Sequence, residues 1–180
     1  GKTLLFPNWD PLTNPQLVAN LRREGIDARI LQESRTSIQK SMRLNTGQCL
    51  PVSIIAQEAM DYVQEHELDP AKTVLWLAKA RVACNIPMYP YYIKNVFEDE
   101  GGGMEKLGVY VGDISHMEIS PKLAVYTYFA YMFGGLLRKL GCRIRPYERT
   151  GGETDEAVER SSRELEESFL GERPIDKTLE

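Results

Sequence analysis

The chain has no excess of positive charge and no long apolar run. Its 180 residues carry 22 lysines and arginines against 26 acidic residues, which gives a formal net charge of −4. This balance argues against a nucleic-acid or membrane-surface partner, because no basic stripe is present to neutralise phosphate groups. No apolar stretch is long enough to span a bilayer, so no membrane partner is expected.

Cysteine is also scarce. The chain has three cysteines, an odd number, far apart and without secretory features, and this usage favours a reducing cytoplasm. The first apolar run, "TLLF", is too short for a signal peptide and enters a strand at once. A strand with almost no lead-in favours a piece excised from a longer protein, and a short native start is the alternative.

Several catalytic motifs are missing. The sequence has no P-loop pattern, and Gly101 to Gly103 are not followed by the Lys-Ser/Thr pair of such a loop. It also lacks GxGxxG after the first strand, a GxSxG elbow and HExxH. The residues alone therefore indicate a ligand-binding or metal-binding domain and no named reaction.

Strand-like and helix-like segments alternate along the chain. Strands are expected at 3–10, 27–34, 73–77 and 107–113, with a candidate fifth strand at 142–148. Helices are expected at 14–25, 50–68, 87–103, 120–141 and 154–172, and a polar stretch covers 35–48. This alternation predicts a single α/β domain over 1–180. Its core is an open, mostly parallel, three-layer sheet of four or five strands, flavodoxin-like or Rossmann-like. Residues 151–180 form a charged C-terminal helix and tail.

Polar and sulfur-containing side chains follow the strands of this predicted sheet. Loops from strand to helix emerge at the carboxyl edge of a parallel sheet, where ligands bind. The loops after the four strands hold the candidate residues Asn8 and Asp10; Asn45, Thr46, Gln48 and Cys49; Arg81 and Cys84; and His116.

Cys49 is the strongest candidate for a functional residue. It lies two residues before Pro51, at the expected amino end of a helix, where unpaired N–H groups and the helix dipole favour an anion such as a thiolate. Nucleophiles and metal ligands both require a thiolate, whereas the alternative is a small buried hydrophobic residue. Cys84 in "VACNIP" repeats this placement. The spacing of the two is not that of a zinc knuckle, and two thiolates leave a four-ligand metal incomplete.

The other candidates each have a structural alternative. Cys142 follows "LG" ahead of the candidate fifth strand, so it is expected in the core at the amino edge of the sheet. His116 is either an acid, base or ligand, or a loop histidine satisfied by its neighbours. Asp10 either orients a ligand or serves turn chemistry. A Cys49 nucleophile paired with His116 is a further reading.

Four stretches carry a family resemblance: "LLFPNWDPLTNPQL", "RLNTGQCLPVSIIAQEAMDY", "ACNIPMYPYYIK" and "YFAYMFGGLLRKLGCRIRPYE". They resemble the C-terminal part of large proteins related to the activators and components of 2-hydroxyacyl-CoA dehydratases, often labelled CoA-substrate-specific enzyme activases. "NTGQCLP" is the most specific piece. In that superfamily an ATP-hydrolysing activator passes an electron to a flavodoxin-like component whose cysteines hold iron–sulfur clusters, a chemistry of anaerobic metabolism.

The resemblance implies that Cys49 and Cys84 hold a [4Fe–4S] cluster, with Cys142 as a third candidate ligand. It also implies a partner, either the remainder of a larger activase-like protein or a dehydratase component. This chain contains no nucleotide-binding activator module, so ATP hydrolysis is not expected. Because the cluster-binding components of the family are longer, a complete cluster is not expected in the isolated chain.

Overall fold

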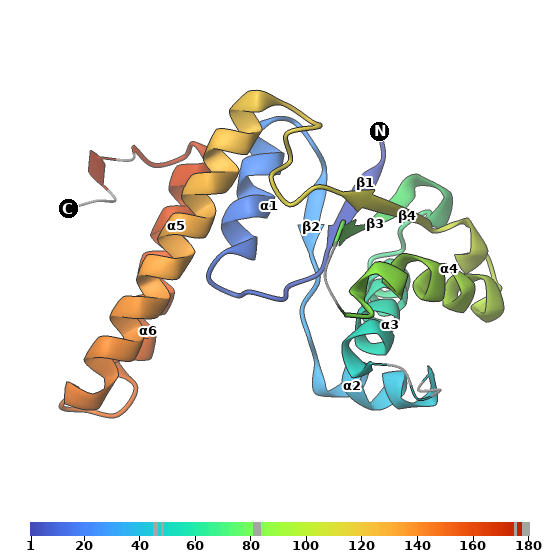
Figure 1. Ribbon diagram of the computed structural model, residues 1–180, viewed down its shortest axis with the longest axis horizontal. Coiled ribbons are helices and arrows are strands. Elements are labelled where there is room, and N and C mark those ends of the chain that lie inside the picture. Colours follow the sequence, from blue (N-terminus) through green and yellow to red (C-terminus); the bar gives the residue numbers. More distant parts are fainter. Residues whose placement is uncertain (45–46, 48, 81–83, 175, 178–180) are drawn as a thin grey trace. The chain divides into compact units, whose positions relative to one another are not determined.

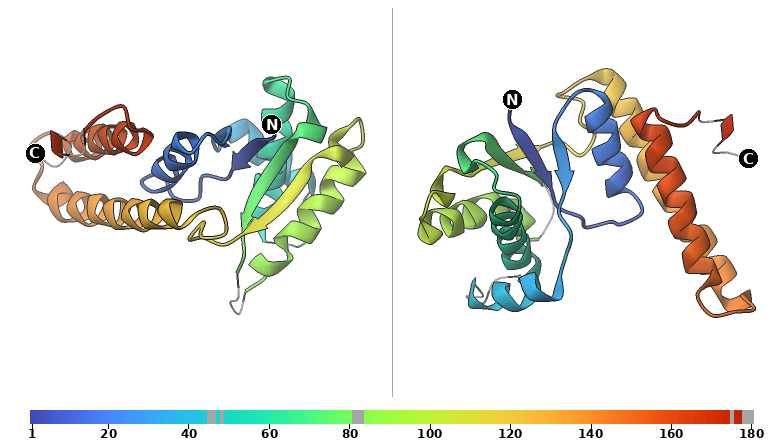
Figure 2. Two further views of the ribbon diagram at one scale, coloured as in Figure 1. Left: turned by 90° about the horizontal axis from the view of Figure 1, so that it is seen from above. Right: turned by 180° about the vertical axis from the view of Figure 1, so that it is seen from behind.

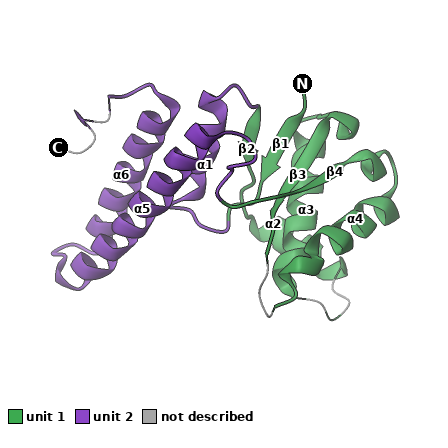
Figure 3. Ribbon diagram, turned by 45° about the horizontal axis from the view of Figure 1, so that its top comes forward, with its two compact units in different colours: residues 1–8, 27–114 green, residues 9–26, 115–180 purple. Residues whose placement is uncertain are grey.

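The computed structural model describes residues 1–44, 47, 49–80, 84–174 and 176–177. Its contacts divide the chain into two compact units (Figure 3). Residues Gly1–Asn8 and Asp27–Ile114 form the first, which we call the sheet unit. Residues Trp9–Ile26 and Ser115–Glu180 form the second, the helical unit. Each unit is described by itself.

The sheet unit contains a four-stranded, all-parallel sheet (Figure 1). Its strands are β1 (Thr3–Phe6), β2 (Ala28–Ile30), β3 (Thr73–Ala78) and β4 (Gly108–Gly112), in the order β2-β1-β3-β4. All four strands coincide with predicted ones. The predicted α/β class, an open parallel sheet with flanking helices, is confirmed.

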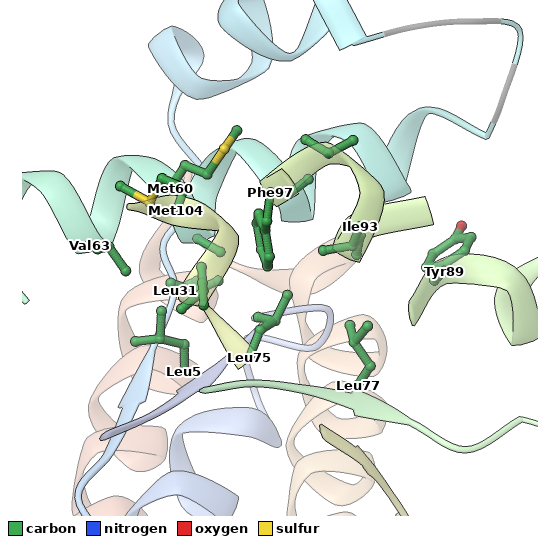
Figure 4. Close-up of a cluster of buried hydrophobic side chains, with 14 of the residues drawn as sticks. Leu5, Leu31, Met60, Val63, Leu75, Leu77, Tyr89, Ile93, Phe97 and Met104 are labelled. Carbon is green, nitrogen blue, oxygen red and sulfur yellow. The ribbon is translucent and has the colours of Figure 1, made fainter. Parts of the chain in front are cut away.

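The two faces of the sheet carry alternate side chains. Leu5 and Leu75, which pair in register, belong to the core cluster beneath α3 (Leu50–Glu65) and α4 (Tyr89–Glu100). Figure 4 shows how this cluster brings together strand leucines with Met60 and Val63 of α3 and Ile93 and Phe97 of α4. The alternate residues Phe6 and Trp76 are also buried and stack with ring centroids 4.5 Å apart. Burial of this kind provides most of the free energy of folding.

One helix of the sheet unit lies in the stretch that was predicted to be a polar connection. α2 (Arg35–Ser41) begins at the N-cap Ser34, whose hydroxyl accepts a hydrogen bond from the Ser37 backbone N–H at 2.9 Å. Short 3₁₀ turns complete the unit at Met42–Leu44, Pro70–Lys72, Ile86–Met88 and Met104–Lys106. α4 ends before Gly101, which has a positive φ that glycine adopts at little cost.

The helical unit consists of α1 (Asn14–Arg23), α5 (Pro121–Ile144), a 3₁₀ turn at Arg145–Tyr147 and α6 (Glu153–Leu170). α5 and α6 run side by side as an antiparallel pair (Figure 2). Ser120 is the N-cap of α5, and its hydroxyl accepts a hydrogen bond from the Leu123 N–H at 3.0 Å. The buried residues of α5 recur every three or four positions, as a packed helix face requires: Leu123, Thr127, Ala130, Gly134, Leu137 and Gly141.

The predicted fifth strand at 142–148 is wrong. α5 continues through Ile144, and Pro146 lies in the turn that follows. Gly141, which looks like a helix stop, is buried where α5 meets α6, and a Cβ there would lie 3.2 Å from a Val158 methyl group. Close helix packing therefore explains this glycine. As a consequence, Cys142 is an exposed helix residue, and its predicted place in the core at the amino edge of the sheet is also wrong.

Candidate functional site

Cys49 lies at the amino end of α3, as predicted. It is the N-cap residue, with extended backbone angles (φ −61°, ψ 127°), and its carbonyl accepts from the Val52 N–H at 3.2 Å. Its side chain makes no capping hydrogen bond with the first turn of α3, so the sulfur remains available for other interactions. The side chain is half-buried and packs against the core cluster of the sheet unit.

Cys84 occupies the corresponding place ahead of α4. Its thiol is exposed and donates to the Asn85 side-chain oxygen at 3.5 Å. The chain then passes through the turn Ile86–Met88, where the Met88 N–H donates to the Asn85 carbonyl at 2.8 Å, and enters α4 at Tyr89. This thiol is open to a ligand or partner approaching from solvent.

Tyr89 is the first residue of α4 and interacts electrostatically with both cysteines. It is buried at the end of the core cluster, beside Ile93 (Figure 4). Burial raises the pKa of the Tyr89 hydroxyl, and a hydrogen bond with the Cys49 side chain and the charges of Cys49 and Cys84 raise it further. The hydroxyl therefore stays protonated at neutral pH and can donate to a thiolate.

The packing role expected of the tyrosines in this stretch is confirmed for Tyr89 and wrong for Tyr91, which is 69% exposed. Sequence reasoning missed the relation of Tyr89 to the cysteines. A local signal could have indicated this relation, because Tyr89 begins the helix that follows Cys84. The third tyrosine of the group, Tyr92, donates to the Leu44 carbonyl and so ties α4 to the segment ahead of Cys49.

Cys49 and Cys84 by themselves do not make a complete ligand set. In the parts of the chain that the structure covers, no three His, Cys, Asp or Glu side chains come together in a metal-binding group. A tetrahedral or cubane centre needs four ligands. The loop candidates Asn45, Thr46, Gln48 and Arg81 lie outside the described residues.

Asn8 and Asp10 fall in different units. The Asn8 side-chain oxygen, in the sheet unit, is buried and has no hydrogen-bond partner among the described residues. The Asp10 carboxylate, in the helical unit, accepts from the Leu12 N–H and the Thr13 hydroxyl, each at 3.0 Å, and pairs with Arg138. Its carbonyl also accepts from the first N–H groups of α1, so Asp10 serves turn chemistry, the alternative raised above.

His116 precedes α5 in the helical unit. Its ring is buried, its φ is +56°, and its Nδ1 lies 3.0 Å from the Thr127 hydroxyl. The Nδ1 contact fits a loop histidine bonded to its neighbours, and a role as acid, base or ligand stays a prediction. Cys49 belongs to the sheet unit, and the pairing of Cys49 with His116 stays a prediction.

Sequence reasoning also missed a buried acidic group on α3. The Asp61 carboxylate accepts from Gln57 and Lys40 at 2.9 Å and from the Ser37 hydroxyl at 3.0 Å, which ties α2 to α3. Burial raises the pKa of the neighbouring Glu58 to about 7, and the negative charges of Glu33 and Asp61 act in the same direction. These contacts are structural and lie apart from the cysteine chemistry.

None of the protein-family models, curated proteins or solved structures compared with the chain matches it. The resemblance to CoA-substrate-specific enzyme activases therefore rests on the quoted residues alone. Within the described residues, no helix combines the length and the apolar character that a membrane crossing requires.

Proposed function

We propose that the sheet unit provides Cys49 and Cys84 as thiolate ligands of an iron–sulfur centre used in low-potential electron transfer. The unit would belong to a larger protein of the 2-hydroxyacyl-CoA dehydratase or activase type. The observation that carries this proposal is that Cys49 and Cys84 precede α3 and α4, two helices that pack against each other, and that the charges of both cysteines act on the Tyr89 hydroxyl. The remaining ligands come from the rest of the larger protein or from a partner, because the described residues offer no third ligand nearby.

The surroundings of the two sulfurs suit such a centre. Cys49 stands at the amino end of α3, whose first N–H groups lack helix partners and favour a negatively charged sulfur. The protonated Tyr89 hydroxyl offers a further donor. Hydrogen bonds to sulfur and exclusion of solvent are the protein's means of tuning a cluster potential. Exposed Cys84 leaves one side of the centre open to the missing ligands.

Anaerobic reconstitution tests the proposal. The chain is incubated with iron, sulfide and an excess of a small thiol that completes the coordination, and bound iron and absorbance near roughly 400 nm are measured. Cys49→Ser and Cys84→Ser are expected to lose bound iron, whereas the exposed Cys142→Ser serves as the matched control and is expected to retain it. Iron content that is unchanged by Cys49→Ser contradicts the proposal.

A second candidate function is a non-catalytic interaction domain with structural cysteines. Large apolar side chains on α5 favour it, because each of them is about half exposed or more: Val125, Tyr128, Met132, Leu136 and Ile144. Thiol titration of the native chain separates the two readings at Cys49. Rapid modification of this half-buried residue supports a ligand role, and slow modification together with an absence of bound iron supports the structural role.

A further inference from the structure

The helical unit contains a pocket of about 710 Å³ where α5 meets the end of α6. Three aromatic side chains of α5, Tyr126, Phe129 and Phe133, line it together with Phe169 of α6. Arg23, at the end of α1, and Arg173, beyond α6, contribute the charged part of the lining. Pockets that bind small molecules commonly have volumes of roughly 300 to 1,000 Å³ and mostly apolar walls with a few polar groups.

The aromatic wall is held by ring contacts. Phe169 is buried and meets Tyr126 and Phe133 edge to face, with centroid distances of 6.4 Å and 6.3 Å. Phe129 lies beside Phe133 at 6.4 Å and remains 39% exposed. Edge-to-face contacts fix ring orientation. The pocket therefore has a fixed inner wall at Phe169 and an accessible ring at Phe129.

One positive charge in the pocket lacks a carboxylate. The Arg23 guanidinium carbon lies 5.1 Å from the centroid of the Tyr126 ring, and no carboxylate among the described residues pairs with it. Arg173 is paired instead, with the Glu164 carboxylate at 3.2 Å. Glu172 also lines the pocket but forms no ion pair in the part of the chain that the structure covers. A guanidinium above an aromatic face presents its N–H donors outward, in the geometry that carboxylates accept.

We propose that this pocket binds a small apolar molecule carrying one carboxylate. Its apolar body would lie against the four rings, and its carboxylate would pair with Arg23. A neutral ligand of the same shape leaves Arg23 without a counter-ion, and a cationic one is repelled by it. The pocket belongs to the helical unit and uses neither Cys49 nor Cys84, so this inference stands independently of the proposed iron–sulfur function.

Three probes of similar size test the proposal: 4-phenylbutyrate, 4-phenylbutanol and 4-phenylbutylammonium. Isothermal titration calorimetry on the full chain is expected to show that the carboxylate binds about threefold more tightly than the alcohol, the size expected of an ion pair with the solvent-exposed Arg23. The ammonium ion is expected to bind more weakly than the carboxylate. Equal affinity for all three probes, or no binding of the carboxylate at millimolar concentration, overturns the proposal.

Variants locate the site. Arg23→Gln is expected to reduce the affinity for phenylbutyrate to that for the alcohol, while Arg163→Gln, an exposed arginine of α6 outside the pocket, is the matched control and leaves it unchanged. Phe129→Ala removes a partly exposed ring and is expected to reduce the affinities for phenylbutyrate and phenylbutanol by the same factor. Phenylbutyrate binding that survives both Arg23→Gln and Phe129→Ala in folded protein contradicts the assignment.

Discussion

Replacement of Glu58 by glutamine should stabilise the protein in a pH-dependent way. Glu58 is only 7% exposed on α3, where burial and the charges of Glu33 and Asp61 raise its pKa from 4.5 to about 7. The folded state therefore binds the Glu58 proton more tightly than the unfolded state does. This contribution to stability is fully present below about pH 4.5 and is lost as the pH rises through about 7.

The shift sets the size of the effect. A difference between 4.5 and about 7 corresponds to about 3 kcal/mol of the free energy of unfolding. Glutamine keeps the shape of the protonated side chain and carries no charge at any pH. Glu58→Gln is therefore expected to raise the free energy of unfolding by about 2 to 3 kcal/mol at pH 8, and by less than about 1 kcal/mol at pH 5.

Urea unfolding followed by circular dichroism at the two pH values measures this difference. Glu65→Gln, at the exposed end of the same helix, is the matched control and is expected to change stability by less than about 0.5 kcal/mol at either pH. Equal effects of Glu58→Gln at pH 5 and pH 8, or a loss of stability at pH 8, would refute the reasoning.

Two further predictions concern α5 and Tyr89. Gly134→Ala should destabilise the helical unit by about 2 kcal/mol or more, because a Cβ there would lie 2.2 Å from the Thr13 hydroxyl. Its neighbour Gly135 has open space around it, so Gly135→Ala should stabilise by about 0.5 to 1 kcal/mol through helix propensity, and thermal unfolding of the two variants compares them. Tyr89→Phe should make the potential of a reconstituted cluster more negative by on the order of tens of millivolts, whereas Tyr91→Phe, an exposed residue of the same helix, should leave it unchanged in voltammetry. Equal potentials for the two tyrosine variants would count against the donor role of Tyr89.

Local sequence patterns predicted most of the fold. Short apolar runs bounded by turn residues predicted all four strands, and Pro51 and Pro121 marked the first turns of α3 and α5. α2 was missed because its stretch is polar, and its buried Ser37 hydroxyl bonds to Asp61, 24 positions away. The false fifth strand was placed directly after Gly141, but α5 continues past this glycine, which packs against Val158 of another helix.

The same distinction between local signals and long-range contacts applies to the candidate site. The position of Cys49 at a helix start follows from the proline two residues later, which is a local signal. The burial of Tyr89 and its relation to Cys49, 40 positions earlier, depend on the packing of α4 against the core. The raised pKa of Glu58 likewise depends on residues distant in sequence, since Glu33 lies 25 positions before it. Such contacts leave no periodic trace in the sequence.

The convergence of two sulfurs is the central claim, and cross-linking tests it most directly. Sulfurs that ligate one cubane cluster lie roughly 6 to 7 Å apart. A bis-methanethiosulfonate reagent of that reach, applied to the folded Cys142→Ser variant, is expected to join Cys49 and Cys84 within one chain, as read by mass spectrometry of the digested protein. Modification of each cysteine separately, with no intramolecular bridge between them, would contradict the account.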